Sequence, residues 1–248
     1  MTDWIARPFP NMNARLRLFC LPYAGGGTAV YHPWGRQLPA EVELCPIRLP
    51  GREGRIAERP YDQLLPLVDA LAQAIFPYLE KPFALFGHSM GALLSFELAR
   101  ALRRRYGRLP AHLFVSGSDA PDRLAFDPPL HTLPDPEFVA QVRDRYKGLP
   151  DVIWQNAGLM QTFLPALRAD FTLIETYTCR PDAPLGMPIT TYGGEQDPET
   201  SRANLAAWRS HTDRAFSLKL FPGDHFFIQS AQPALLQALS RDLARYLK

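Results

Sequence analysis

The stretch from Phe83 to Gly91, FALFGHSMG, limits the possible folds of this chain more than any other part of it. A short apolar run ends in Gly-x-Ser-x-Gly, and apolar residues at helical spacing follow from Ala92. Strand, sharp turn and helix in this order are the context of a nucleophile elbow, in which a strained turn exposes the serine. The amide groups and positive dipole end of the helix would face an oxygen that gains negative charge. The motif predicts Ser89 as a nucleophile; the alternative is a tight turn that only needs small residues.

Size, charge and cysteine content narrow the class of protein. The 248 residues, 46% of them hydrophobic, predict a single α/β domain over residues 1–248. A net charge of +2 argues against a nucleic-acid partner, which requires a concentrated basic stripe. No apolar run has the length of a membrane span, so no membrane partner is expected. Three scattered cysteines predict reduced thiols in a cytoplasmic protein.

Strand and helix patterns alternate along almost the whole chain, which predicts a mainly parallel sheet wrapped by helices. Strands are expected at residues 16–21, 43–48, 83–88, 112–117, 188–192 and 216–221, and helices at 64–79, after Ser89, at 200–211 and near the C-terminus. The gap between the fourth and fifth strands is longer than a crossover needs. A helical lid insertion over about 120–186 is therefore expected, with helical patterns at 135–146 and 159–177. An apolar stripe from Met160 to Ile174 could cover the serine, pack on the core, or do both.

The first strand runs into Pro22-Tyr23-Ala24-Gly25-Gly26-Gly27. A phosphate cradle is disfavoured, because neither a P-loop pattern nor a dinucleotide fingerprint is present. An oxyanion loop is the better interpretation, with the N–H of Ala24 and the N–H of Met90 as donors to the substrate oxygen. The alternative is a flexible connection between a strand and a helix.

The base and the acid are sought at the ends of later strands. His225 lies in a glycine-containing loop just after the last strand, from which its ring can reach Ser89. The chain order Ser, Asp, His then favours Asp197 after the fifth strand. The Asp197 carboxylate would hold the His225 ring in the correct tautomer. Asp119 also ends a strand on the same edge and is a second candidate for the acid.

Two arginine-rich segments have no assigned chemistry. The loop from Leu49 to Arg55 mixes turn residues with arginines that are expected to be solvated. A second cluster ends the helix after Ser89 and comprises Arg100, Arg103, Arg104, Arg105 and Arg108. Cations are favoured at a helix C-terminus, which accounts for most of them. A docking patch for an acidic partner is the alternative.

Together the motifs resemble the type II thioesterases of nonribosomal peptide and polyketide synthesis, which are α/β-hydrolases. The matching stretches are LPYAGGG at 21–27, LPGRE at 49–53, FGHSMG at 86–91, YGG at 192–194 with Asp197, and GDHFF at 223–227. The resemblance implies hydrolysis of acyl groups from the phosphopantetheine arm of carrier proteins in antibiotic-type pathways. It also implies Ser89, Asp197 and His225 as the triad, Ala24 and Met90 as oxyanion donors, and no metal or organic cofactor.

The chain departs from the family pattern at the acid. Pro198 follows Asp197 where the family often has a second acid, and Asp119 resembles the acid placement of integrated release domains. Two further hypotheses remain beside the thioesterase. One is an esterase or acyltransferase of the same fold, and the other is a binding protein that kept the fold without the chemistry.

Overall fold

The computed structural model describes residues 4–126, 128–146 and 151–247. Its centre is a six-stranded sheet in the order β2-β1-β3-β4-β5-β6, in which every neighbouring pair is parallel. The strands are β1 (Leu16–Leu21), β2 (Val42–Pro46), β3 (Phe83–His88), β4 (His112–Ser116), β5 (Ile189–Gly194) and β6 (Phe216–Phe221). The predicted α/β-hydrolase class with a mainly parallel sheet is confirmed.

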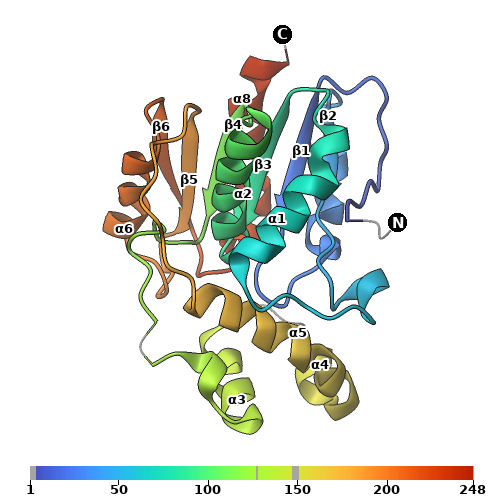
Figure 1. The fold of residues 1–248 in the computed structure, drawn as a ribbon, viewed down its shortest axis with the longest axis vertical. Coiled ribbons are helices and arrows are strands. Elements are labelled where there is room, and N and C mark those ends of the chain that lie inside the picture. Colours follow the sequence, from blue (N-terminus) through green and yellow to red (C-terminus); the bar gives the residue numbers. More distant parts are fainter. Residues whose placement is uncertain (1–3, 127, 147–150, 248) are drawn as a thin grey trace.

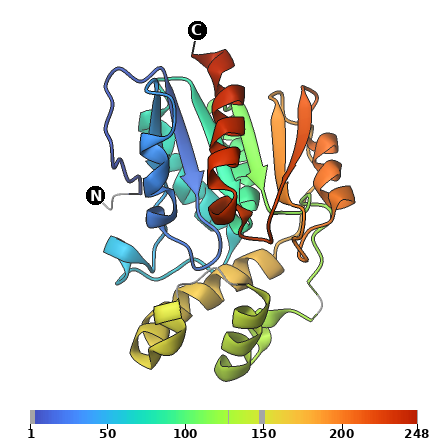
Figure 2. The same ribbon diagram turned by 180° about the vertical axis from the view of Figure 1, so that it is seen from behind.

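Helices cover both faces of this sheet. Helices α1 (Leu64–Ile75) and α2 (Met90–Tyr106) lie on one face, and α8 (Gln232–Leu243) and the 3₁₀ helix Thr28–Arg36 lie on the other (Figures 1 and 2). Because both faces are covered, the inner strands are continuous apolar runs whose alternate residues enter different cores. In β1, Phe19 packs with the α1 and α2 side, whereas Leu18 packs with the α8 side.

A helical insertion, which we define as residues 117–188, connects β4 to β5. It contains α3 (Asp135–Arg145), α4 (Asp151–Gln155) and α5 (Ala157–Glu175), which lie together beyond one end of the sheet (Figure 1). The insertion has its own apolar cluster, which includes Phe138, Ile153 and Phe171. The sequence patterns predicted α3 and α5 but not α4, which is too short to give a helical period. The predicted lid role and single-domain organisation stay predictions.

The remaining helices are shorter and less regular than their sequence patterns. The predicted helix 200–211 is α6 (Arg202–Ala206) followed by the 3₁₀ helix Ala207–His211, and α1 likewise continues into the 3₁₀ helix Phe76–Tyr78. A short α7 (Phe227–Ser230) precedes α8. No helix formed by the described residues has the length and apolar character that crossing a membrane requires.

The prediction that the arginines of the loop from Leu49 to Arg55 are solvated was wrong. Arg52 is only 3% exposed and Arg55 only 5%. The Arg55 guanidinium donates to both carboxylate oxygens of Glu58 and lies 3.8 Å from the centroid of the Trp4 ring. Burial of these charges is tolerated because each guanidinium is paired with a carboxylate and a backbone carbonyl, from distant segments for Arg52 and from the same loop for Arg55.

The basic cluster at the end of α2 is partly a structural clamp. Arg100 is buried and donates to Glu97 and to the carbonyl of Arg180. Arg103 donates to the carbonyls of Ala183 and Pro184. These two side chains hold the end of the insertion against α2, so helix-end electrostatics alone do not explain them. Arg104 and Arg108 are exposed.

The buried side chain of His112 makes the stability of the fold depend on pH. His112 opens β4 with its ring stacked on Phe114 and hydrogen-bonded to Thr190 and Tyr246, and burial lowers its pKa from 6.5 to about 4. The unfolded chain therefore takes up a proton at a higher pH than the folded chain does. The stability that depends on keeping His112 neutral is therefore fully present above about pH 6.5 and is lost as the pH falls towards 4.

We expect the His112→Gln variant to lose less stability in acid than the wild type. Between about pH 7 and about pH 4.5, the wild-type free energy of unfolding should fall by about 2 kcal/mol more than that of the variant. Urea denaturation at a series of pH values measures both curves. Parallel curves would show that His112 titrates normally in the folded chain.

Candidate active site

Ser89 lies between β3 and α2 in a backbone conformation that non-glycine residues rarely adopt. Its φ of 53° and ψ of −119° fall outside the helical and extended regions. The turn is held from both sides, because the Ser89 N–H donates to the carbonyl of Ser116 at 2.7 Å and its carbonyl accepts from Ala92 at 2.9 Å. This strained turn has the geometry expected of a nucleophile elbow.

The two glycines that flank Ser89 are required by the close approach of neighbouring backbone. A Cβ on Gly87 would overlap the carbonyl group of Gly91, and a Cβ on Gly91 would overlap the carbonyl group of Leu21. The Gly-x-Ser-x-Gly spacing therefore comes from the crossing of β3, α2 and the end of β1. The overlaps explain the two glycines, as a tight turn that only needs small residues would also require. The strained backbone of Ser89 is the feature that points to a nucleophile elbow.

The His225 ring lies against Asp197. The loops after β5 and β6 are joined by hydrogen bonds between Gln196 and Gly223, which bring the two side chains together. His225 Nδ1 lies 2.9 Å from Asp197 Oδ2, and Asp197 also accepts from the Glu199 N–H and the Thr200 hydroxyl. Burial opposes ionisation, but the hydrogen bond and charge of His225, with the other two donors, keep the pKa of Asp197 below its usual value.

The opposite ring nitrogen of His225 is available for chemistry. Among the described residues, no hydrogen-bond partner is present for Nε2, which is buried. A ring nitrogen that no protein group engages can accept a proton, as a general base must, and His225 also lines the cavity with Ser89. His88, next to Ser89 in sequence, is fully buried with Nδ1 3.0 Å from the hydroxyl of Ser116, and burial holds its pKa well below the usual value.

Asp119 is engaged elsewhere. Its carboxylate accepts from the side-chain amide of Asn204 at 2.7 Å and from the N–H of Ser201 at 3.3 Å. No hydrogen bond joins it to His225 in the described part of the chain, and burial raises its pKa. The structure therefore brings Asp197, and not Asp119, to the histidine.

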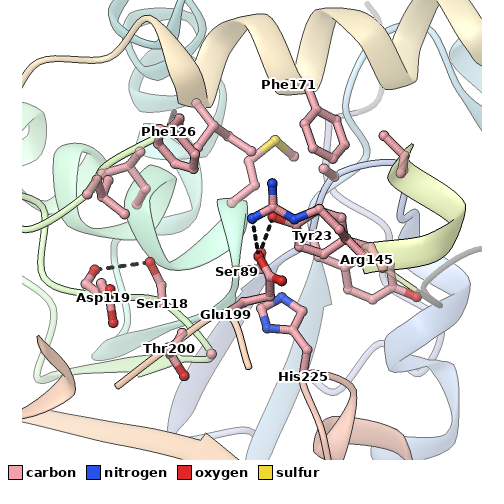
Figure 3. A pocket seen from close by; sticks show the side chains of 18 of the residues that line it. Tyr23, Ser89, Ser118, Asp119, Phe126, Arg145, Phe171, Glu199, Thr200 and His225 are labelled. Atoms are coloured by element: carbon pink, nitrogen blue, oxygen red, sulfur yellow. Dashed lines mark hydrogen bonds and ion pairs between the residues drawn. The ribbon is translucent and has the colours of Figure 1, made fainter. Parts of the chain in front are cut away.

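Ser89 and His225 share one cavity of about 180 Å³. Ala24 from the glycine-rich loop and Met90 from the start of α2 also line it, as the oxyanion prediction requires. In Figure 3, Ser89 and His225 lie towards the sheet, with Phe126 and Phe171 of the insertion across from them. On the α5 stripe, Leu167, Phe171 and Ile174 line the cavity. Leu167 and Phe171 also belong to the apolar cluster of the insertion, on which Met160 and Phe163 pack. No group of acidic, histidine or cysteine side chains suited to a metal ion occurs among the described residues.

Sequence reasoning missed a polar contact on the wall of this cavity. Glu199 accepts from Arg145 at 3.0 Å and from the hydroxyl of Tyr146 at 2.9 Å (Figure 3). Both partners come from the end of α3, and the Tyr146 ring also lies 5.7 Å from the His225 ring. The contact ties the insertion to the loop that carries Asp197. Its partners are more than 50 positions apart, and no local pattern relates them.

The model of the family described as "Thioesterase domain" matches residues 16–243, which is nearly the whole chain. The chain belongs to the thioesterase family. It is 42% identical over 243 residues to the gramicidin S biosynthesis protein GrsT of Aneurinibacillus migulanus, covering 98% of this chain and 94% of GrsT. The matched range includes the strands, the elbow and the histidine loop described above.

Solved structures agree with this assignment. RedJ, a thioesterase from the prodiginine pathway of Streptomyces coelicolor, is 42% identical with a TM-score of 0.87, covering 93% of this chain and 91% of RedJ. BorB, a type II thioesterase from the borrelidin biosynthetic cluster, is 35% identical with a TM-score of 0.89, covering 100% of this chain and 98% of BorB. The predicted resemblance to type II thioesterases is confirmed, and the chain is a thioester hydrolase and not a binding protein on a hydrolase fold.

The position of the acid generates a prediction about turnover. We expect Asp197→Asn to lower kcat by roughly 10⁴-fold, because an amide in this place favours the wrong tautomer of His225. Asp119→Asn is the matched control, since it changes a half-buried carboxylate that lines the cavity and also follows a strand at this edge of the sheet, and it should lower kcat far less. Steady-state hydrolysis of an acyl thioester measures both. The opposite ranking of the two variants would assign the acid to Asp119.

Proposed function

We propose that this thioesterase hydrolyses acyl or peptidyl thioesters on the phosphopantetheine arm of carrier proteins, and so clears mis-primed or stalled synthases. The observation that carries the proposal is the cavity shared by Ser89, His225 and the glycine-rich loop. Its relatives by name and title act in gramicidin S, prodiginine and borrelidin biosynthesis, which supports a carrier-bound substrate. A cytoplasmic location, with the three cysteines reduced, stays a prediction.

The first half-reaction transfers the acyl group to the enzyme. His225 Nε2 takes the proton of the Ser89 hydroxyl while the serine oxygen attacks the thioester carbonyl. Asp197, bonded to Nδ1, stabilises the imidazolium that forms. The negative carbonyl oxygen accepts from the N–H groups of Ala24 and Met90. Collapse of the tetrahedral adduct breaks the C–S bond, and the thiol of the carrier arm leaves with the proton from His225.

The second half-reaction releases the acid. Water gives its proton to His225 and attacks the acyl-serine, and the same N–H groups receive the charge of the second tetrahedral adduct. Breaking the bond to the Ser89 oxygen returns the proton to the serine. Apart from the thioester and water, the two half-reactions as proposed need only groups of the chain.

The Ser89→Ala variant tests the mechanism. The side chain is small, so we expect the variant to fold with a normal midpoint of urea unfolding. Loss of a triad nucleophile should lower kcat for an acyl thioester on the order of 10⁶-fold. Hydrolysis and unfolding are measured on the same preparation. A folded Ser89→Ala variant that still turns over the thioester would exclude the acyl-serine mechanism.

Carrier recognition is tested separately. We expect a higher kcat/KM for an acyl group on a carrier protein than for the same acyl group on a small thiol, because contacts remote from the thioester can lower its barrier. Equal or faster hydrolysis of the small thioester would contradict carrier recognition.

The basic cluster on α2 requires a careful choice of variants. Arg104→Glu and Arg108→Glu change exposed side chains, and Arg104 loses only a 3.7 Å ion pair with Asp182. Arg103→Glu would break hydrogen bonds to two backbone carbonyls. If exposed charge docks the carrier, the first two variants should raise KM for the carrier substrate alone. Unchanged KM values would place the carrier-binding surface elsewhere.

A further inference from the structure

The loop after β2, which contains Arg52, lies against the glycine-rich loop after β1. No local sequence pattern indicates this contact. We propose that Arg52, acting with Asp170 of α5, is a positioning residue that fixes the glycine-rich loop so that the Ala24 N–H faces the substrate oxygen. The inference rests on the proposed oxyanion role of Ala24 and identifies what holds that group in place.

Arg52 and Asp170 form a buried two-point ion pair. Arg52 Nη1 lies 2.8 Å from Asp170 Oδ2, and Nη2 lies 2.7 Å from Oδ1. The two side chains are 4% and 3% exposed. Two parallel N–H···O bonds between planar groups fix both orientation and distance, and burial reduces screening by water. The pair is therefore a rigid support.

The same two side chains hold consecutive parts of the glycine-rich loop. Asp170 Oδ2 accepts from the Gly25 N–H at 2.8 Å, and Arg52 Nη1 donates to the Gly26 carbonyl at 3.1 Å. While these bonds exist, the Gly25 N–H is occupied and cannot serve the substrate. Within this loop, the Gly25 N–H therefore has a structural role, whereas the Ala24 N–H has the proposed role of oxyanion donor.

The turn that contains Ala24 depends on the bond to Gly25. The Gly26 N–H donates to the Tyr23 carbonyl at 2.8 Å, and Gly25 has a φ of 74°. A β-turn with a positive φ at its third residue is of type II. Types I and II differ in the direction of the central peptide group, which here carries the Gly25 N–H. Asp170, which accepts the Gly25 N–H, therefore stabilises the type II turn. The Ala24 N–H belongs to the preceding peptide group, so its place in the cavity depends on where the whole turn is held.

The neighbouring residue Glu53 anchors the other end of the loop. Its carboxylate oxygens lie 3.0 Å from the Thr28 hydroxyl, and one of them accepts from the Ala29 N–H at 3.3 Å. Glu53 itself has a φ of 50°, which is strained for a residue with a side chain. Arg52 and Glu53 thus contact the loop before and after Gly27.

A purely structural arginine in the same loop looks different. Arg55 is equally buried, but its Nε donates to Glu58 and its Nη1 to the Arg48 carbonyl, away from the glycine-rich loop. Arg52 Nε is buried with no partner among the described residues. Arg52 instead uses its two terminal nitrogens, which donate to the Asp170 carboxylate and to the Gly26 carbonyl. Arg55 is accordingly the matched control.

The test compares Arg52→Gln, Arg52→Lys and Asp170→Asn with Arg55→Gln in the full chain. For each variant we would measure kcat and KM for a small-thiol acyl thioester, the unfolding midpoint in urea, and the affinity for an alkylboronic acid. The boronic acid forms a negatively charged tetrahedral adduct with Ser89, so it reports on the oxyanion contacts. Lysine keeps the charge of Arg52 but loses its planar two-point geometry.

We expect the Arg52 and Asp170 variants to lower kcat by about 10²-fold, as misplacement of a reacting group by about 1 Å does. KM should change by less than about threefold, and boronic acid affinity should fall in parallel with kcat/KM. Arg55→Gln should lower the unfolding midpoint but leave kcat and boronic acid affinity near wild type. If Arg52→Gln does not fold, Arg52→Lys and Asp170→Asn carry the same expectations.

The proposal is overturned if the folded Arg52 and Asp170 variants keep kcat, or lose kcat while boronic acid affinity is unchanged. It is also overturned if Arg55→Gln lowers kcat and boronic acid affinity as much as they do, because any packing defect would then suffice. A wild-type protein that hydrolyses no thioester would instead refute the proposed function, and the inference with it. Failure of the inference is seen in the variants, and failure of the proposed function is seen in the wild type, so the two are distinguishable.

Discussion

The strained, positive-φ backbone at Ser89 is the constraint on which the rest of the site depends. Such a conformation costs about 1–3 kcal/mol and persists only where its surroundings fix it. Here the adjacent strand β4 accepts its N–H, and the glycines on either side let β3, α2 and the end of β1 meet. The elbow must therefore lie on an inner strand. With β1 on one side and β4 on the other, the glycine-rich loop and the base of the insertion are brought to the serine by sheet order alone.

Polar side-chain pairs then join this strained centre to the more distant segments. Asp197 with His225 links the loops after β5 and β6, whereas Arg52 with Asp170 and Arg145 with Glu199 link the core to the insertion. A buried pair loses hydration that its attraction only partly restores, so its main effect is to fix geometry. Helix α5 both lines the cavity and supports the glycine-rich loop. Leu167, Phe171 and Ile174 line the cavity, while Asp170 on the same helix holds the loop that carries Ala24.

The sequence predicted what depends on local pattern. Apolar runs gave the six strands, the Gly-x-Ser-x-Gly spacing gave the elbow, and loop position singled out His225. It favoured Asp197 as the acid but kept Asp119 as a second candidate, because both end parallel strands. In the structure β5 lies beside β6, and Asp197 is the one that lies against His225. It misjudged Arg52 because arginine is usually exposed and its partner Asp170 lies 118 positions away. Contacts of that range have no local signature, and the same holds for Glu199 with Arg145.

The chemistry of thioesters explains why so much structure supports one loop. A thiolate is a good leaving group, so acylation demands little help in expelling it and proton transfer to sulfur is a minor barrier. The charge that develops on the carbonyl oxygen is then the main quantity the protein can stabilise, and only donors fixed in advance do so effectively. A loop rich in glycine leaves room for the substrate but has little stiffness of its own. A buried ion pair beneath that loop supplies the stiffness without adding a side chain to the cavity.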